Sequence, residues 1–333
     1  MPFNPDAQLV AGLSDVKKLD MVPTRDGFGA GLVKAGEKNP AVVALCADLA
    51  ESTRVHWFKE KFPERYIEMG VAEQNMATVA SGLANYGKIP FIASYAAFSP
   101  GRNNEQIRTT IALNNLPVKI VGAHAGISVG PDGATHQALE DIALMRVQPR
   151  MTVIVPCDSV EAEKATIAAA SHPGPVYIRL GREKSPVFTT AETPFEIGKA
   201  LVLREGADVS IMGCGMLLWH ALLAAEDLAE EGIDAEVINV HTVKPLDKAA
   251  IEASAKKTGA VVTVEEHQVH GGLGGAIAER LAKVHPVPMQ FVGVGNRFGE
   301  SGMPEELIEA FGLGKESIKK AARHAIERKK CLG

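Results

Sequence analysis

A single carboxylate opens the most distinctive stretch of this sequence. The segment GVAEQNMATVASG, residues 70–82, places Glu73 after a glycine and in the first turn of an expected helix, whose apolar residues recur every three or four positions. An acid in a first turn ordinarily only stabilises the helix dipole. The stretches that follow in the sequence make a chemical role for Glu73 the stronger interpretation.

Two further stretches carry side chains suited to a planar or polar ligand. SYAAFSPGRNNEQIR, residues 94–108, places Tyr95 and Phe98 at the end of an expected strand, where their rings could stack on a planar heterocycle. HAGISVGPDGATHQALED, residues 124–141, places His124, Asp132 and His136 in a glycine-rich loop that leads into a helix. Two histidines bracketing an aspartate in such a loop favour recognition of a polar substrate.

A third stretch carries positive charge. IRLGREKSP, residues 178–186, ends an expected strand with Arg179 and Arg182. Guanidinium groups bind phosphate through two parallel hydrogen bonds, so both arginines are candidate anchors for a phosphate group.

The elements that must position these side chains alternate between strands and helices. Short β-branched runs, among them AVVALCADL, IPFIASYA, LPVKIVGA, MTVIVP, PVYIRL, ADVSIMGCG, DAEVINV and AVVTVEE, lie between helical patterns. This order predicts an α/β fold of two domains with mostly parallel sheets flanked by helices. The proline-containing stretch 185–197 reads as a linker, so we expect domains at residues 20–186 and 197–326.

Composition excludes several classes of protein. The 333 residues are 46% hydrophobic and 23% charged with a net charge of −5, which suits a soluble two-domain protein and argues against a nucleic-acid partner. The four cysteines are far apart and include no C-x-x-C pair, so neither a zinc site nor a disulfide framework is indicated. No segment is apolar enough for a membrane span or a signal peptide, and we expect a cytoplasmic location.

Taken together and in order, these motifs resemble the transketolase family. Residues 70–76, 94–108, GISVGPDGATHQALEDIA and RLGRE look like its pyrimidine-binding domain, whereas VINVHTVKPLD and EEHQVHGGLGGAIAE look like its C-terminal domain. The resemblance covers residues 20 to 325. The sequence departs from many transketolases at two places: it has AEQ where they have REH, and SPGRNN where they are more apolar. At both places it resembles short two-subunit transketolases and, less closely, deoxyxylulose-phosphate synthases.

The resemblance implies a role for each cofactor-binding residue. Glu73 matches the glutamate that hydrogen-bonds N1′ of the aminopyrimidine of thiamine diphosphate and donates a proton toward it, which activates the cofactor without touching the sugar. Phe98 matches the ring that stacks on the aminopyrimidine, and Tyr95 a neighbouring pocket position. Asp48 matches an aspartate beside the thiazolium and the substrate channel.

The resemblance also implies a substrate site. His124, Asp132 and His136 match groups that bind the hydroxyls and the reacting oxygens of a ketose, and the two histidines count as catalytic residues with Glu73. The residues matching those that hold a sugar phosphate at the mouth are Arg25, Ser52 and Arg182.

One part of the family's active site has no counterpart in this sequence. The G-D-G motif, through which a divalent metal holds the diphosphate, does not occur. We therefore expect no metal site in this chain, and a separate N-terminal subunit that binds the diphosphate with Mg²⁺ or Ca²⁺. Thiamine diphosphate is then expected at the interface of a complex containing two copies of each chain.

Three rival assignments stay open at this level. The β subunit of a 2-oxoacid dehydrogenase E1 has the same layout and also lends a glutamate to the pyrimidine, although it has less need of a loop such as GPDGATHQ. The motifs also leave open a deoxyxylulose-phosphate synthase subunit and a non-catalytic assembly or regulatory subunit. The sequence does not determine the donor ketose, the acceptor aldose, the identity of the partner chain, or whether the chain is a natural subunit.

Overall fold

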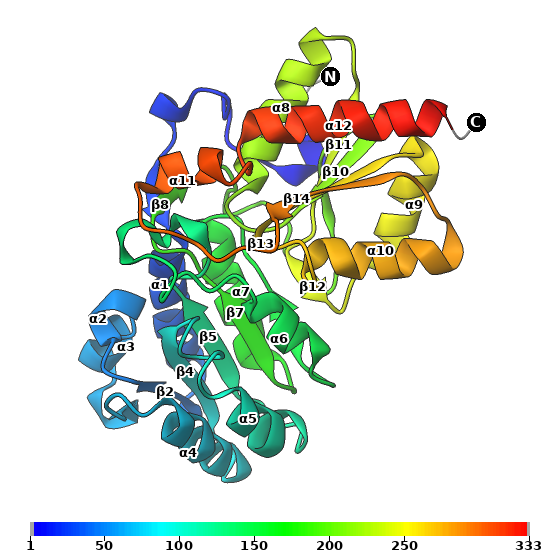
Figure 1. Ribbon diagram of the computed structural model, residues 1–333. Coiled ribbons are helices and arrows are strands. Elements are labelled where there is room, and N and C mark those ends of the chain that lie inside the picture. Colours follow the sequence, from blue (N-terminus) through cyan, green and yellow to red (C-terminus); the bar gives the residue numbers. More distant parts are fainter. Residues whose placement is uncertain (1–2, 332–333) are drawn as a thin grey trace.

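A seven-stranded sheet forms the centre of the first domain in the computed structural model, which describes residues 3–331 (Figure 1). The strand order is β12-β6-β7-β5-β4-β2-β3, and every neighbouring pair is parallel except β12 with β6. The strands are β2 (Val42–Cys46), β3 (Tyr66–Glu68), β4 (Ile89–Tyr95), β5 (Lys119–Ala123), β6 (Thr152–Ile154), β7 (Val176–Arg179) and β12 (Thr242–Lys244). Because β2, β5, β6 and β7 are buried along their whole length, most of their residues are apolar.

Helices cover both faces of this sheet. On one face α1 (Thr24–Lys38) and α7 (Ser159–Ser171) pack with Val42 and Ala44 of β2, and the short helices α2 (Ala50–Thr53) and α3 (His56–Lys61) lie beside α1. On the other face α4 (Glu73–Asn85), the π-helical turn η4 (Ile107–Ala112) and α6 (Asp141–Val147) share a core with Val43 and Leu45, and the short helix α5 (Asn104–Gln106) lies beside α4 and η4. Successive residues of β2 therefore point to opposite layers.

A five-stranded sheet forms the second domain. Its order is β14 (Met289–Val294), β13 (Val261–Gln268), β10 (Val209–Gly213), β11 (Ala235–Asn239) and β9 (Leu201–Arg204), all parallel except β9. Helices α8 (Leu218–Glu230) and α12 (Lys315–Lys330) cover one face, while α9 (Lys248–Thr258) and α10 (Leu273–Val284) cover the other. The core under α9 and α10 is continuous with the core under α4, so the two domains pack on shared apolar side chains.

The N-terminal segment connects both domains. Its helical turns η1 (Pro5–Ala7) and η2 (Val16–Lys18) precede β1 (Met21–Pro23), which pairs antiparallel with β8 (Lys184–Pro186). Ala7 and Leu13 are buried in the core of the second domain, and the Asn4 amide donates to the Leu203 carbonyl at 2.8 Å. The segment before the first domain is therefore part of the second domain's core.

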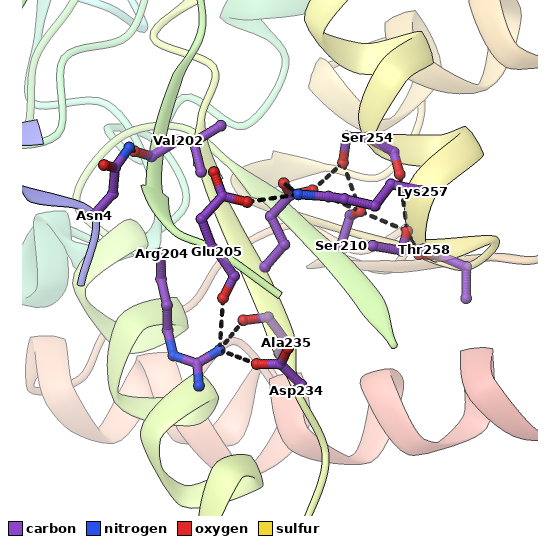
Figure 2. A network of polar contacts seen from close by, with 12 residues as sticks. Asn4, Val202, Arg204, Glu205, Ser210, Asp234, Ala235, Ser254, Lys257 and Thr258 are labelled. Carbon is purple, nitrogen blue, oxygen red and sulfur yellow. Dashed lines mark hydrogen bonds and ion pairs between the residues drawn. The ribbon is translucent and has the colours of Figure 1, made fainter. Parts of the chain in front are cut away.

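A polar network links β9 to β11 and β10 to helix α9 in the second domain (Figure 2). The Arg204 guanidinium, 1% exposed, donates to the Ala235 carbonyl and to Asp234 at 3.4 Å. Ser210 of β10 lies 2.6 Å from the Ser254 hydroxyl of α9, so the sheet and the helix share hydrogen bonds as well as apolar contacts. Each buried polar group that finds a partner avoids the desolvation penalty of an unpaired one.

The observed architecture confirms the predicted fold class. All eight apolar runs that predicted strands lie on strands, and α4 begins at Glu73 and stops before Gly87, which has the positive φ of 79° expected of a helix stop. Residues 187–200 carry no helix or strand and join β8 to β9. The strand β12 was not predicted, and it carries the second half of the chain into the first sheet. Across residues 3–331, none of the helices is both long and apolar enough to cross a membrane.

Candidate active site

The predicted acid lies where the polypeptide turns from β3 into α4. Gly70 adopts a positive φ of 65° in that turn, and Glu73 is the first residue of the helix, with only 2% of its surface exposed. Its Oε2 accepts a hydrogen bond from Arg102 Nη1 at 2.7 Å, and its main-chain oxygen accepts one from Asn103 Nδ2 at 3.1 Å. The first-turn position of this carboxylate is confirmed, and its partner is an arginine to which the sequence analysis gave no role.

A second carboxylate fixes the loops around this turn. Glu68, at the end of β3, accepts hydrogen bonds from the backbone amides of Asp48 at 2.8 Å and Gly70 at 2.9 Å. Burial alone raises the pKa of Glu68, but the Tyr66 hydroxyl and these amides outweigh burial and hold the pKa below its usual value. Glu68 therefore stays charged and ties the loop that carries Asp48 to the loop that leads to Glu73.

Four rings meet at the ends of β4 and β5. The Tyr95 ring stacks on His124 with centroids 3.9 Å apart and lies 5.9 Å from the Phe98 ring, whereas His136 meets Phe98 edge-on at 5.4 Å. Because β4 and β5 are parallel neighbours, their carboxyl ends meet at one edge of the sheet, which is where α/β folds bind ligands. The structure thus brings together the aromatic and histidine residues that the sequence placed in two separate motifs.

His124 is held neutral in this cluster. It is 2% exposed, and burial, followed by the charges of Arg25 and Arg182, lowers the pKa of its ring to about 3. Arg25 Nη1 lies 3.4 Å from His124 Nε2, and a guanidinium can only donate, so Nε2 accepts and Nδ1 carries the proton. His124 Nδ1 is buried without a hydrogen-bond partner among residues 3–331, so its N–H is left to donate to a ligand oxygen.

Charged side chains surround the rings on the side of β1 and β7. Arg25 Nη1 donates to the Ser52 carbonyl at 2.8 Å, and burial, followed by the charge of Arg54, lowers the pKa of Arg25. Arg182 Nη1 donates to the Val129 carbonyl at 2.6 Å and lies 4.0 Å from Asp132 Oδ1. These contacts fix both guanidinium groups beside the glycine-rich loop, where they form a positively charged side of the site.

The predicted site residues form one connected group. Contacts run from Glu73 through Arg102 to the rings, and from His124 through Arg25 to Ser52. Asp48 is the outlying member, because it reaches the group only through a cavity of about 320 Å³ that it lines with Ser52, Glu68 and Lys59. The remaining predicted residues lie on the loop side of the rings, and they are Asp132, His136 and Arg182.

The interpretation of Arg179 as a phosphate anchor was wrong. Its side chain is 6% exposed, with Nε 2.8 Å from Asp141 Oδ2 and Nη2 2.7 Å from the Glu266 carbonyl. The Tyr177 hydroxyl donates to the same Asp141 oxygen at 2.6 Å. Arg179 is the last residue of the strand, and its side chain is hydrogen-bonded within a buried network. Arg182 lies beyond the strand end.

The second domain supports the glycine-rich loop, which the sequence analysis did not anticipate. The backbone amide of Ser128 donates to Glu266 Oε1 at 2.6 Å, and Gln137 Nε2 donates to the Glu300 carbonyl at 2.9 Å. Helix α11 (Pro304–Ala310) packs against η5 (Ile127–Asp132), the helical turn of this loop. The loop that carries Asp132 and His136 thus rests on residues from both domains.

The arrangement can hold a planar nitrogen heterocycle. The Arg102 guanidinium, itself planar, lies 4.9 Å from the Phe98 centroid while bonded to Glu73, so one flat group can contact both the carboxylate and the ring. Within the part of the chain that the structure describes, no cluster of three or more His, Cys, Asp and Glu side chains is arranged to hold a metal ion.

Two family models match the chain. Residues 20–187 match the model described as "Transketolase, pyrimidine binding domain", and residues 198–318 match "Transketolase, C-terminal domain". Together they cover both sheets.

Individual relatives agree with these matches. The chain is 46% identical over 312 residues to the 6-deoxy-6-sulfo-D-fructose transketolase subunit SqwH of Clostridium sp. (strain MSTE9), covering 94% of this chain and 97% of that one. It is 36% identical to human transketolase but spans 51% of that protein, against 95% of its own length. A solved structure described as a split gene transketolase, inactive beta4 tetramer, is 46% identical with a TM-score of 0.87, covering 92% of this chain and 99% of that one.

Proposed function

Because the chain belongs to the transketolase family, we propose that it is one subunit of a split, thiamine-diphosphate-dependent transketolase. The reaction we assign to the complex is transfer of a two-carbon ketol unit from a ketose phosphate to an aldose phosphate. The observation that carries this proposal is the buried Glu73 carboxylate at the start of α4, one arginine away from the Phe98 ring at the carboxyl edge of the sheet.

The chain's residues fit the pyrimidine half of the cofactor. Thiamine diphosphate, when bound, supplies the carbon nucleophile and the electron sink for breaking a carbon–carbon bond beside a carbonyl. Glu73 is assigned to hydrogen-bond N1′ of the aminopyrimidine and to hold the proton there, with Phe98 and Tyr95 against the ring. Asp48 is assigned to the thiazolium side, on the loop that Glu68 holds in place.

The histidine cluster is assigned to the sugar. His124 stays neutral at physiological pH, so its Nδ1–H donates to a substrate oxygen without adding charge to the site. His136 and Asp132 lie on the same loop and are assigned to the reacting oxygens and hydroxyls of the ketose. The cationic residues Arg25 and Arg182 are assigned to the phosphate, with Ser52 beside Arg25.

A partner subunit is required to complete this site. The sequence has no G-D-G motif, and we assign the diphosphate and its Mg²⁺ to a separate N-terminal subunit in a complex with two copies of each chain. Two findings support a shared site: a relative of nearly equal length is named as a transketolase subunit, and a similar solved chain is described as an inactive tetramer of β subunits.

The proposal is tested by reconstitution. Two-carbon transfer from xylulose 5-phosphate to ribose 5-phosphate is measured with thiamine diphosphate and Mg²⁺, for this chain alone, for a candidate partner that contains G-D-G, and for the mixture. We expect transfer only in the mixture. Because a relative is named for a sulfonated sugar, 6-deoxy-6-sulfofructose is tested as a second donor.

Three outcomes would contradict the proposal. Transfer by this chain alone would remove the need for a partner. An associated, cofactor-loaded mixture that transfers from neither donor would refute the ketol-transfer assignment. Release of CO2 from pyruvate by that mixture would assign the chain to 2-oxoacid chemistry instead.

A further inference from the structure

Arg102 occupies the position that the proposed function assigns to the aminopyrimidine. Its Nη1 lies 2.7 Å from Glu73 Oε2, and its guanidinium carbon lies 4.9 Å from the centroid of the Phe98 ring. The same two residues, a buried carboxylate and an aromatic ring, are the ones assigned to the cofactor. We propose that, in the chain without its partner subunit, Arg102 acts as a placeholder: its guanidinium fills the pyrimidine subsite, and thiamine diphosphate displaces it when the complex forms. This inference rests on the proposed function.

The chemistry of the guanidinium supports the exchange. It is planar and delocalised, donates N–H groups in its own plane and stacks on aromatic rings, as an aminopyrimidine with its amino group does. Both groups are flat, stack on a ring and hydrogen-bond Glu73, the guanidinium as a donor to the carboxylate and N1′ of the aminopyrimidine as the acceptor of the carboxyl proton. An aminopyrimidine that takes the same carboxylate oxygen must therefore displace the Arg102 guanidinium from it.

The charge on Glu73 gives a second, independent argument. The contact with Arg102 is an ion pair, which requires the carboxylate form. The role assigned to Glu73 requires a carboxyl proton held toward N1′, and an N–H of Arg102 already occupies Oε2 at 2.7 Å. Arg102 must therefore leave before Oε2 can hold that proton.

The side chain is free to leave. Arg102 is 48% exposed, whereas Glu73 is 2% exposed, so the arginine can move into solvent while the acid stays fixed. Its side chain makes no other hydrogen bond or ion pair to residues 3–331. While it is bound it also compensates the buried charge of Glu73, which explains why the acid is tolerated in a chain that lacks its partner.

The expected size of the effect follows from the exposure of this pair. A half-exposed ion pair with a cation–π contact competes only weakly with the cofactor for the site. The apparent affinity of the cofactor is its intrinsic affinity multiplied by the fraction of chains in which Arg102 has left the site. Removing the guanidinium should therefore tighten cofactor binding by a factor of about 2 to 10.

The experiment has two arms. In the full chain without a partner, Glu73→Gln, Arg102→Met and the double variant are compared by thermal unfolding, and the two changes should not be additive. In the complex with the G-D-G-containing subunit, thiamine diphosphate is titrated by calorimetry. Arg102→Met should bind thiamine diphosphate more tightly than the wild type. Arg102→Lys keeps the charge without the planar group, so its affinity should lie between those two. Arg108→Met changes an exposed arginine six residues later, serves as the control and should bind like the wild type.

The outcomes separate this inference from the proposed function. A wild-type complex that binds no thiamine diphosphate overturns both. Binding by the wild type that Arg102→Met leaves unchanged or weakens overturns the placeholder role and leaves the proposed function standing. Additive effects of the two changes on unfolding show that the pair does not form in the separate chain, and that result also overturns the inference.

Discussion

Replacing Glu73 by glutamine should separate turnover from folding. The change keeps the shape of the side chain but removes its charge and its ability to supply a carboxyl proton. General acid–base groups contribute roughly 10²- to 10⁴-fold to a rate, which is about 3 to 5 kcal/mol of barrier. We expect the reconstituted complex to lose that much two-carbon transfer at saturating cofactor.

Folding should be affected far less. The lost ion pair has a half-exposed arginine as its partner, and such pairs are worth about 1 kcal/mol or less. The hydrogen bond from Asn103 Nδ2 goes to the main-chain oxygen of Glu73 and survives the change. The free energy of unfolding should therefore fall by about 1 kcal/mol, with association unchanged.

The assay pairs turnover with urea unfolding of the same samples. Glu105→Gln, an exposed acid on the neighbouring short helix α5, is the control and should leave both measurements unchanged. Full turnover in the Glu73→Gln complex would refute the role of this carboxyl group. A loss of turnover that follows a loss of folding or association would show that Glu73 is a structural residue instead.

Three further changes test the electrostatics and the packing. The pKa of His124 falls from 6.5 to about 3 on folding, so the neutral ring's contribution to stability is complete above pH 6.5 and is lost as the pH falls toward 3. His124→Asn should remove up to about 5 kcal/mol of this pH dependence of the free energy of unfolding. An unchanged pH profile would contradict the buried neutral ring. Asp141→Asn removes the carboxylate that pairs with the buried Arg179 and should lower the free energy of unfolding by about 3 to 5 kcal/mol, measured in urea. A loss below about 1 kcal/mol would mean that water reaches the pair. Gly27→Ala places a methyl group 1.8 Å from a backbone oxygen of α7 and should lower the free energy of unfolding by about 2 kcal/mol, measured by thermal unfolding. Gly82→Ala, with open space around the added methyl group, is the control and should be neutral or stabilising. Equal effects of the two changes would refute the close approach of α1 and α7.

The fold could be predicted where strands are buried on both faces. β2, β5 and β10 are buried along their whole length and mostly apolar, and their runs stand out in the sequence. β14 escaped prediction because it is an edge strand, MQFVGV, in which Gln290 and Gly293 interrupt the apolar residues. β12 escaped because three residues are too few to show a period and their partner strand lies in the other half of the chain.

The site could be predicted to the level of motifs, but not of partners. The order of motifs brought Glu73, Phe98 and His124 into one hypothesis, and the structure places them in one connected group. Two arginines three residues apart look alike in the sequence, yet the strand ends between them, so Arg179 is buried and Arg182 contacts the glycine-rich loop. Whether a charged side chain is paired inside the fold depends on a residue such as Asp141, which no local pattern identifies.

The position of the glycine-rich loop gives the second domain a part in the proposed site. A loop with several glycines has little stiffness of its own, so its conformation must be imposed by neighbours. Glu266 accepts the Ser128 amide, and burial raises the pKa of this glutamate although Arg179 and the amide oppose the rise. Since Glu266 is on β13 of the second domain, any shift between the domains moves the residue that anchors the loop. His136 and Asp132 therefore depend on the domain interface for their position, and a subunit cut after β8 would lose the loop's support even though every predicted site residue lies before the cut.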